Sequence, residues 1–243
     1  MSLHGLAYKW LGIKRRAVGY SFRVRLSRLA VHGRNFRRNK SIDTNATSFF
    51  EHPFSYTLEG FLQILDLFAF GEIYETITEF LKFRTRALTT DERRIVETLF
   101  ATGLDIDRIR IDERAWAPYI FGMAYVGVYT INYAGKMSED LFVHELIHLW
   151  QYEQRGSVYI PRALSAQRSS AGYNYGGVEA LRSKEVNLWV YNYEQQGDIL
   201  ADYWRAKHKR PTRWKNLVGT TVPYLPLVNQ LKEHSSQNNS DLA

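Results

Sequence analysis

The pattern of apolar and polar positions predicts a mostly helical chain with one short β-rich stretch. Its best-defined helix covers residues 139–155, where Leu146 and Leu149 lie among the buried-side positions of an amphipathic helix. Ser138 precedes this helix in the N-cap position, and Gly156 follows its last turn. The pattern therefore predicts both ends of the helix as well as its apolar face.

A long apolar-periodic stretch lies upstream, from Thr57 to about residue 86. Acidic residues interrupt it, so we interpret it as core helix and not as a membrane span. Gly71 is expected to divide it into two helices, 58–69 and 72–86.

Two capping-box pairs predict two further helices. Thr89 with Glu92 precedes apolar residues at helical spacing, and Gly103 is expected to end that helix. Asn192, with a glutamine three positions later, begins the last helix, which ends before Pro211.

Strand-like alternation appears in residues 107–113 and 126–133, just before the helix 139–155. We expect these strands to form a small sheet that packs on that helix. Residues 157–184 are rich in Ser, Gly and Tyr and are expected to form a long, partly ordered excursion across the mouth of a cleft.

Composition narrows the chemistry. The chain has 243 residues, 45% of them hydrophobic, which suffices for a packed core. It has no cysteine, so disulfides and thiolate metal sites are excluded, and any zinc must be held by His, Glu and Asp.

Charge is distributed unevenly along the chain. Residues 1–45 contain eleven Lys or Arg and one acidic residue, a balance of +10, whereas the rest of the chain balances at −3. This basic arm could bind an anionic surface, lipid or nucleic acid, or be a solvated extension. It lacks an apolar run long enough for a signal peptide, which leaves the cytoplasm or signal-peptide-independent export as alternatives.

These patterns suggest three parts. They are a basic N-terminal arm at 1–45, a domain at 46–210 whose N-terminal part is the helical stretch 57–86, and a C-terminal tail at 211–243 that ends in the polar run SSQNNSDLA.

The chemistry of this chain centres on His144, Glu145 and His148, which form the motif H-E-x-x-H. Residues four apart on a helix share a face, so both imidazoles can bind one metal ion while Glu145 acts as general base. The alternative is a chance match on an ordinary amphipathic helix.

A catalytic zinc site normally has three protein ligands and one water. On the last predicted helix, Glu194 could be the third ligand, and Asp198 could accept a hydrogen bond from one of the histidines. Asp202, one turn further along, is the alternative ligand. Acids near a helix start are also favoured by the helix dipole, without any metal.

These residues resemble a known family. His144-Glu145-x-x-His148 followed by Glu194-x-x-Gly197-Asp198 is similar to the gluzincin metallopeptidases, whose late helix carries E-x-x-A-D. The segments HELIHLWQ, YNYGG and YEQQGDILADY resemble the compact metallopeptidase-like domains associated with bacterial Rhs and Vgr secretion proteins. The likeness covers roughly residues 90–205.

The resemblance implies a compact zincin-like α+β domain, mostly helical, with a small sheet packed on the H-E-x-x-H helix. It implies Zn²⁺ as cofactor, His144, His148 and Glu194 as its ligands, Glu145 as base and Asp198 as a supporting residue. It also implies a peptide or protein substrate and a secretion-apparatus partner.

Two positions depart from zincin patterns. Gly197 replaces the alanine of the gluzincins, an exchange between small residues that we expect the packing to accept. The metzincin pattern fails, because Gln151 and Gln154 occupy the positions of its glycine and third histidine.

The predicted function is therefore zinc-dependent peptide hydrolysis, in which Glu145 accepts a proton from the metal-bound water. A second donor must stabilise the oxyanion, and the candidates are Tyr173, Tyr175, Tyr191 and Arg182. The alternative function is a catalytically silent zincin-like structural or interaction module that docks through its basic arm.

Overall fold

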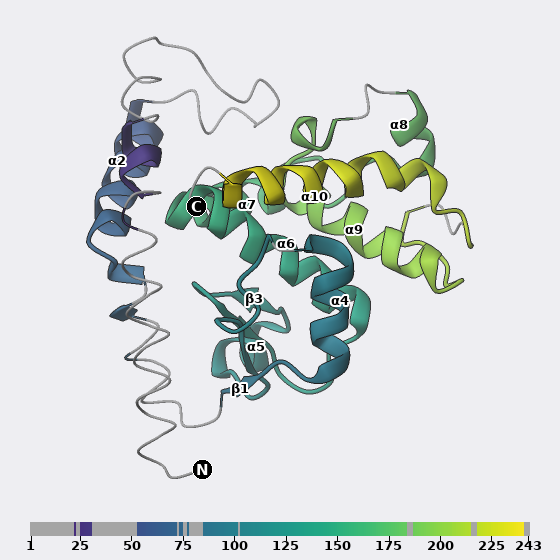
Figure 1. Cartoon of the computed structure of the whole chain (residues 1–243), viewed down its shortest axis with the longest axis horizontal. Helices are drawn as coiled ribbons and strands as arrows, with labels where there is room; N and C mark the ends of the chain where they lie inside the picture. Colours follow the sequence, from purple (N-terminus) through teal and green to yellow (C-terminus); the bar gives the residue numbers. More distant parts are fainter. Residues whose placement is uncertain are drawn as a thin grey trace.

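The structure is a computed structural model of the whole chain, and it describes residues 22, 25–30, 53–71, 73–74, 77, 85–101, 103–183, 187–214 and 218–240. Its elements are α2 (Pro53–Leu67), β1 (Arg86–Ala87), α4 (Thr90–Phe100), β2 (Arg110–Asp112), α5 (Trp116–Phe121), β3 (Tyr125–Val126), β4 (Thr130–Asn132), α6 (Glu139–Arg155), η2 (Gly156–Val158), α7 (Tyr159–Arg168), α8 (Gly177–Ser183), η3 (Leu188–Val190), α9 (Tyr193–Lys207), η4 (Val222–Tyr224) and α10 (Leu225–Ser240). Helices dominate and one small mixed sheet is present (Figure 1), which confirms the predicted α+β class. The narrower zincin-like fold stays a prediction.

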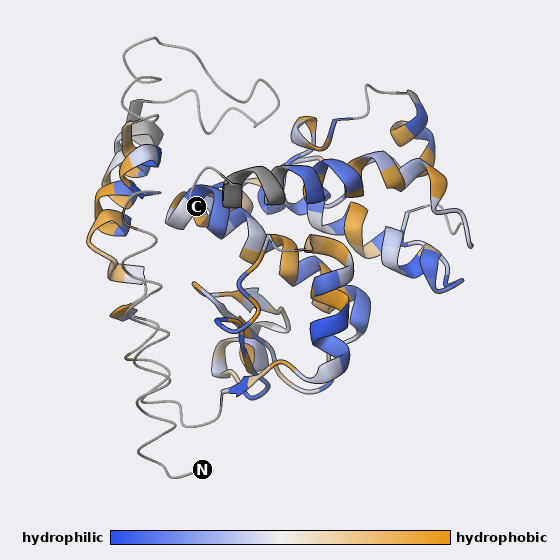
Figure 2. Cartoon of the chain, viewed as in Figure 1, coloured by the Kyte–Doolittle hydropathy of each residue, from blue (hydrophilic) through white to orange (hydrophobic). Residues whose placement is uncertain are grey.

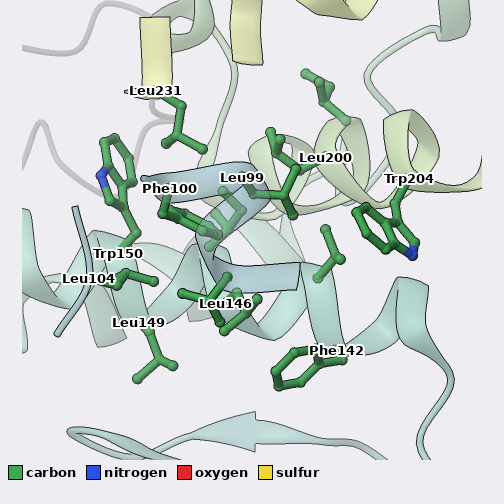
Figure 3. Close-up of a cluster of buried hydrophobic side chains, with 14 of the residues drawn as sticks. Leu99, Phe100, Leu104, Phe142, Leu146, Leu149, Trp150, Leu200, Trp204 and Leu231 are labelled. Atoms are coloured by element: carbon green, nitrogen blue, oxygen red, sulfur yellow. The ribbon is translucent and has the colours of Figure 1, made fainter. Parts of the chain in front are cut away.

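The central element is α6, which matches the predicted helix 139–155. Eleven consecutive residues, from Phe142 to Tyr152, are buried, so the middle of α6 is enclosed on every side. Its most extensive packing partner is α9, and α4 and α10 complete the core. Figure 3 shows Leu146 and Leu149 of α6 in one cluster with Leu200 of α9 and with side chains of α4 and α10. This burial holds the H-E-x-x-H residues inside the protein.

The sheet has the order β1-β2-β4-β3. Its two central strands pair in parallel, with Ile111 opposite Ile131, and both side chains are fully buried. β1 and β3 pair antiparallel on the two outer sides. The edge strand β3 packs against α6, as expected for a sheet that lies on this helix.

Both capping boxes are confirmed. In α4 the Thr89 side chain accepts from the backbone N–H of Glu92, and the Glu92 carboxylate accepts from the backbone N–H of Thr89. Asn192 and Gln195 do the same at the start of α9. The prediction that Gly103 ends the first of these helices was wrong, because α4 ends at Phe100.

The predicted break at Gly71 was also wrong. α2 ends at Leu67, and the turn that follows is made by Phe68 and Ala69, the latter with a φ of 58°. Gly71 itself is helical, and a Cβ there would lie 3.1 Å from the Tyr152 hydroxyl. The glycine therefore allows close packing instead of ending a helix.

Three further expectations need correction. The helix expected at 72–86 cannot extend to Arg86, which lies in β1, and much of that range lies outside the described residues. Residues 126–133 form two strands of a hairpin, not one strand. Residues 157–184 include the helices α7 and α8, so they are more ordered than the Ser- and Gly-rich composition suggests.

The C-terminal segment also contributes to the core. Helix α10 lies within residues 211–243, and Tyr224, Leu227 and Leu231 are at most 1% exposed. Among the described residues, none of the helices has the length and apolarity that crossing a membrane requires.

Candidate metal centre

Helices α6 and α9 bring His144, His148 and Glu194 together. One potential ligand atom from each of these residues lies within 4.8 Å of the others. The Oε2 atom of Glu194 is 3.1 Å from Nε2 of His144 and 3.5 Å from Nε2 of His148. All three side chains are buried. Helical spacing on α6 places the two histidines on one face. The capping box at Asn192 fixes the start of α9 and so the position of Glu194 in its first turn.

In both histidines the Nδ1 atom, the outer nitrogen that faces away from the centre of the cluster, has a hydrogen-bond partner. Nδ1 of His144 lies 3.0 Å from Oδ1 of Asp198, and Nδ1 of His148 lies 2.8 Å from Oε1 of Gln151. Because both partner oxygens are acceptors, each Nδ1 is assigned as the protonated donor. This tautomer leaves both Nε2 lone pairs directed at Glu194 in the centre of the cluster.

The centre of this cluster is an arrangement of acceptors that requires a positive charge. Burial alone would lower the pKa of His144, but hydrogen bonds to Asp198 and Glu194 raise it to about 10. Burial would likewise raise the pKa of Glu194, but the charge of His148 and a hydrogen bond from His144 lower it to about 2. Without a metal, a proton is therefore held between imidazole and carboxylate. A bound metal ion would take its place.

Glu145 lies on α6 between the two candidate histidine ligands in sequence, and its side chain is 4% exposed. Burial raises the pKa of its carboxyl group, while the neighbouring histidines act in the opposite direction. Its Oε2 atom is buried and has no hydrogen-bond partner among the described residues. A buried carboxylate oxygen without a partner is costly, and it is the feature expected of a base that binds a water or substrate proton.

Asp198 is hydrogen-bonded by side chains of the segment 212–214. No pattern in the sequence predicts that this segment lies at the site. Its carboxylate accepts from the Trp214 indole N–H at 2.8 Å and from the Arg213 guanidinium at 3.1 Å. Asp202 anchors this segment by accepting from the backbone N–H groups of Arg213 and Trp214, and from the Tyr175 hydroxyl. Asp202 thus supports Asp198 and does not belong to the His–His–Glu cluster.

Gln151 accepts a hydrogen bond from Nδ1 of His148, as Asp198 does from Nδ1 of His144. This role of Gln151 was not predicted from the sequence. Its amide nitrogen donates to the backbone carbonyl of Tyr193 and to Oε1 of Gln196, each at 3.0 Å. Gln196 in turn donates to the Tyr191 carbonyl. The available signal was spacing, because Gln151 is three residues after His148 and therefore on the same face of α6.

The packing accepts glycine at position 197, as expected, and leaves no room there for a larger residue. A Cβ at this position would lie 2.5 Å from Cε1 and 2.6 Å from Nδ1 of His144. Such distances are too short for non-bonded carbon and nitrogen atoms, so an alanine would require the imidazole to move. Glycine at this position lets α9 approach the ring closely.

The four candidates for oxyanion stabilisation lie in different surroundings. The ring of Tyr173 is 5.8 Å from that of His144, and its hydroxyl accepts from Gln167 at 2.6 Å. The Tyr175 hydroxyl points elsewhere, toward Asp202 and Tyr224. Tyr191 is buried and Arg182 is exposed on α8. Tyr173 is therefore the candidate that the fold brings beside the cluster.

Comparison with known proteins links part of the chain to bacterial secretion. The type VI secretion system spike protein VgrG2b of Pseudomonas aeruginosa is 26% identical over an alignment of 138 residues, and the match covers 51% of this chain. The matched region spans 13% of that protein. No protein-family model matches the chain, and no solved structure matches it. The sequence similarity is thus to one part of a secretion-system spike protein, and the geometry supplies a buried His–His–Glu group that could hold a metal ion.

Proposed function

We propose that this protein is a zinc-dependent metallopeptidase associated with a bacterial secretion system. The observation that carries the proposal is the convergence of three potential ligand atoms within 4.8 Å, beside Glu145, whose Oε2 has no hydrogen-bond partner in the part of the chain that the structure describes. A metal-binding group alone would suit many roles. The adjacent buried carboxylate without a partner favours hydrolysis, because hydrolysis needs a base at the metal.

The donor set suits zinc. Two imidazoles and one carboxylate, His144, His148 and Glu194, are a ligand combination of catalytic zinc sites, which keep a fourth position for water. The hydrogen bonds of Asp198 and Gln151 to the outer nitrogens fix the tautomers that zinc binding requires.

In the proposed reaction, zinc would supply Lewis acidity and a bound water of lowered pKa. Glu145 would accept a proton from the attacking water, whose oxygen forms a bond to the peptide carbonyl carbon. Glu145 would then return that proton to the leaving nitrogen as the C–N bond breaks. Tyr173, beside His144, is the proposed donor to the developing oxyanion.

Elemental mass spectrometry on the purified protein tests the metal site. We expect about one zinc per chain, with loss of zinc in both His148→Ala and Glu194→Ala. Zinc retained in both variants, or absent from the unmodified protein after zinc is supplied, would contradict the proposal.

A peptide-library digestion followed by mass spectrometry tests the activity. Glu145→Gln should keep its zinc and lose cleavage by a factor of at least about a hundred. Glu97→Gln, an exposed position on α4, is the matched control and should cleave normally. Cleavage that continues at the same rate in Glu145→Gln would exclude this mechanism.

One observation favours a second function, that of a catalytically silent structural or interaction module. The three ligand candidates are only 5–7% exposed, as in a structural metal site.

Cobalt substitution separates the two functions. A small hydroxamate should change the visible spectrum of the cobalt protein if a coordination position is open to ligands, and should leave it unchanged if the site is closed.

A further inference from the structure

Helix α5 and the residues just after it present large apolar side chains to solvent. Trp116, Tyr119 and Ile120 are 73%, 81% and 51% exposed, and Met123 is 53% exposed. We call these four side chains the α5 patch. A single exposed apolar side chain is ordinary, but a group of large ones that lie close together marks a binding surface.

The fold sets the outward direction of these side chains. Ala115 and Pro118, on the other side of α5, are buried. The backbone N–H of Ala115 donates to the Tyr133 carbonyl at 3.2 Å, which ties the start of the helix to the end of β4. The helix ends at Gly122, whose φ is 66° and whose N–H donates to the Pro118 carbonyl at 2.8 Å. α5 is therefore fixed at both ends with its large side chains outward.

A series of side-chain contacts connects the α5 patch to the candidate metal centre. The Sδ atom of Met123 lies 3.6 Å from the amide nitrogen of Gln167, on α7. The same nitrogen donates to the Tyr173 hydroxyl at 2.6 Å. The ring of Tyr173 lies 5.8 Å from that of His144. The side chains of Gln167 and Tyr173 thus form a direct bridge between the patch and a candidate ligand.

A second series of contacts reaches the other histidine. β3 begins two residues after Met123, and the backbone carbonyl of Val126 in this strand accepts from the Tyr159 hydroxyl at 2.7 Å. The ring of Tyr159 lies 6.1 Å from that of His148. The segment from α5 to β3 is therefore connected to both candidate histidine ligands and lies along one side of the candidate metal centre.

The chemistry of this segment indicates what binds there. The sequence has no charged residue between Arg114 and Lys136. In Figure 2, α5 is drawn in pale and orange tones, without the deep blue of charged residues. Such a surface offers no cations to the phosphates of nucleic acid. Its aromatic rings and thioether instead suit other apolar side chains.

We propose that the α5 patch binds large apolar side chains of the peptide substrate. This proposal rests on the proposed function, because the patch adjoins the site at which a peptide would be cleaved. An extended peptide spans about 3.3–3.6 Å per residue, so the bound side chain belongs to a residue a few positions from the scissile bond. Large apolar side chains are mostly buried in folded proteins. The substrate class is therefore unfolded or extended segments that contain leucine and aromatic residues.

Peptide binding to the full chain tests the proposal without requiring cleavage. The probes are two fluorescein-labelled peptides of Gly, Ser and Thr, one with Leu and Phe and the other with Ala at the same positions. On the zinc-loaded Glu145→Gln protein, fluorescence anisotropy should show about tenfold or more tighter binding of the Leu/Phe peptide. Adding the triple change Trp116→Ser/Tyr119→Ser/Ile120→Ser should remove this preference.

The matched control is the triple change Phe61→Ser/Ile64→Ser/Phe68→Ser on α2, at positions that are also apolar and are 55%, 46% and 63% exposed. It should keep the preference for the Leu/Phe peptide. Circular dichroism should show an unchanged fold in both triple variants. If the α5 triple variant does not fold, Tyr119→Ser alone, at a position that is 81% exposed, should still reduce the preference.

A hydroxamate that carries the Leu/Phe peptide tests whether the patch and the metal bind one substrate. The α5 triple variant should bind this peptide hydroxamate about tenfold more weakly and should bind acetohydroxamate like the unmodified protein. Equal affinity of the unmodified protein for the two labelled peptides would overturn the proposal. So would equal losses in the α5 and α2 variants, or an unchanged affinity of the α5 variant for the peptide hydroxamate. A protein without zinc that keeps the peptide preference would contradict the proposed function and not the binding of apolar peptides by the patch.

Discussion

The backbone of Gly197 lies so close to the ring of His144 that a Cβ would come within 2.5 Å of the imidazole Cε1. The same imidazole is held by Asp198 on one side and faces Glu194 on the other. It therefore has little freedom to move away from a larger residue at position 197. The close approach of α9 to α6 sets the position of this ligand candidate.

Gly197→Ala should weaken metal binding by about tenfold or more, because displacing a ligand or its supporting contacts typically costs this much affinity. Competition with a chromophoric zinc chelator measures the change. Gly127→Ala is the control, since its added Cβ would have only ordinary contacts at 3.6 Å or more. Equal zinc affinity in both variants would show that His144 tolerates the displacement.

Replacing Gln151 tests the support of His148. Gln151→Met keeps the approximate length of the side chain but removes the acceptor for Nδ1 and leaves the carbonyl of Tyr193 without this donor. We expect a tenfold to hundredfold loss of zinc affinity, roughly, and about 1–3 kcal/mol of lost stability from buried polar groups without partners. Chelator competition and urea denaturation measure the two effects separately. Wild-type zinc affinity in this variant would exclude a role for Gln151 in orienting His148.

The metal-free protein should be most stable in mildly acidic solution. The pKa of His144 rises from 6.5 to about 10 on folding, so its contribution is complete below pH 6.5 and is lost as the pH rises through about 10. The pKa of Glu194 falls from 4.5 to about 2, so its contribution is complete above pH 4.5 and is lost toward pH 2. Thermal unfolding with chelator should therefore give the highest Tm between pH 4.5 and 6.5.

Zinc should remove the alkaline part of this dependence, because the metal ion replaces the proton held by His144. In the variant His144→Asn, measured without metal, most of the decline of Tm at alkaline pH should also disappear. A Tm of the metal-free protein that rises from neutral pH toward pH 10 would contradict the assigned direction of the His144 pKa shift.

Local signals in the sequence predict the elements that carry the site. The N-cap at Ser138, the glycine at 156 and the capping box of Asn192 are all interactions between residues a few positions apart, and the structure contains each of them. Spacing of four residues likewise places His144 and His148 on one face. Such features depend on neighbouring residues, so the sequence contains them completely.

The features that the sequence did not predict depend on contacts between distant segments. Arg213 and Trp214 reach Asp198 because Asp202 binds their backbone, a relationship that no local pattern encodes. The clash that a Cβ at Gly197 would cause depends on the packing of two helices. The prediction for α2 was wrong for another reason. Its apolar periodicity predicted a core helix, but the face of α2 that is buried is polar.

The ion pair between Glu59 and Arg162 should be an important link between α2 and the rest of the protein. Both side chains are at least 85% buried and joined by two hydrogen bonds. Removing one partner of a buried ion pair typically costs about 3–5 kcal/mol, because the other charge stays buried without it. Glu59→Gln should therefore destabilise the docking of α2, measured as faster hydrogen exchange across residues 57–67.

The double variant Glu59→Leu/Arg162→Leu should recover much of this loss, since it removes both charges together. Asp91→Asn is the control, because its ion pair with Arg94 is exposed and should contribute less than about 1 kcal/mol. If Glu59→Gln exchanges no faster than Asp91→Asn, the inverted orientation of α2 does not depend on this ion pair. The contacts of Asp66 with Ser157 would then be the interaction to change next.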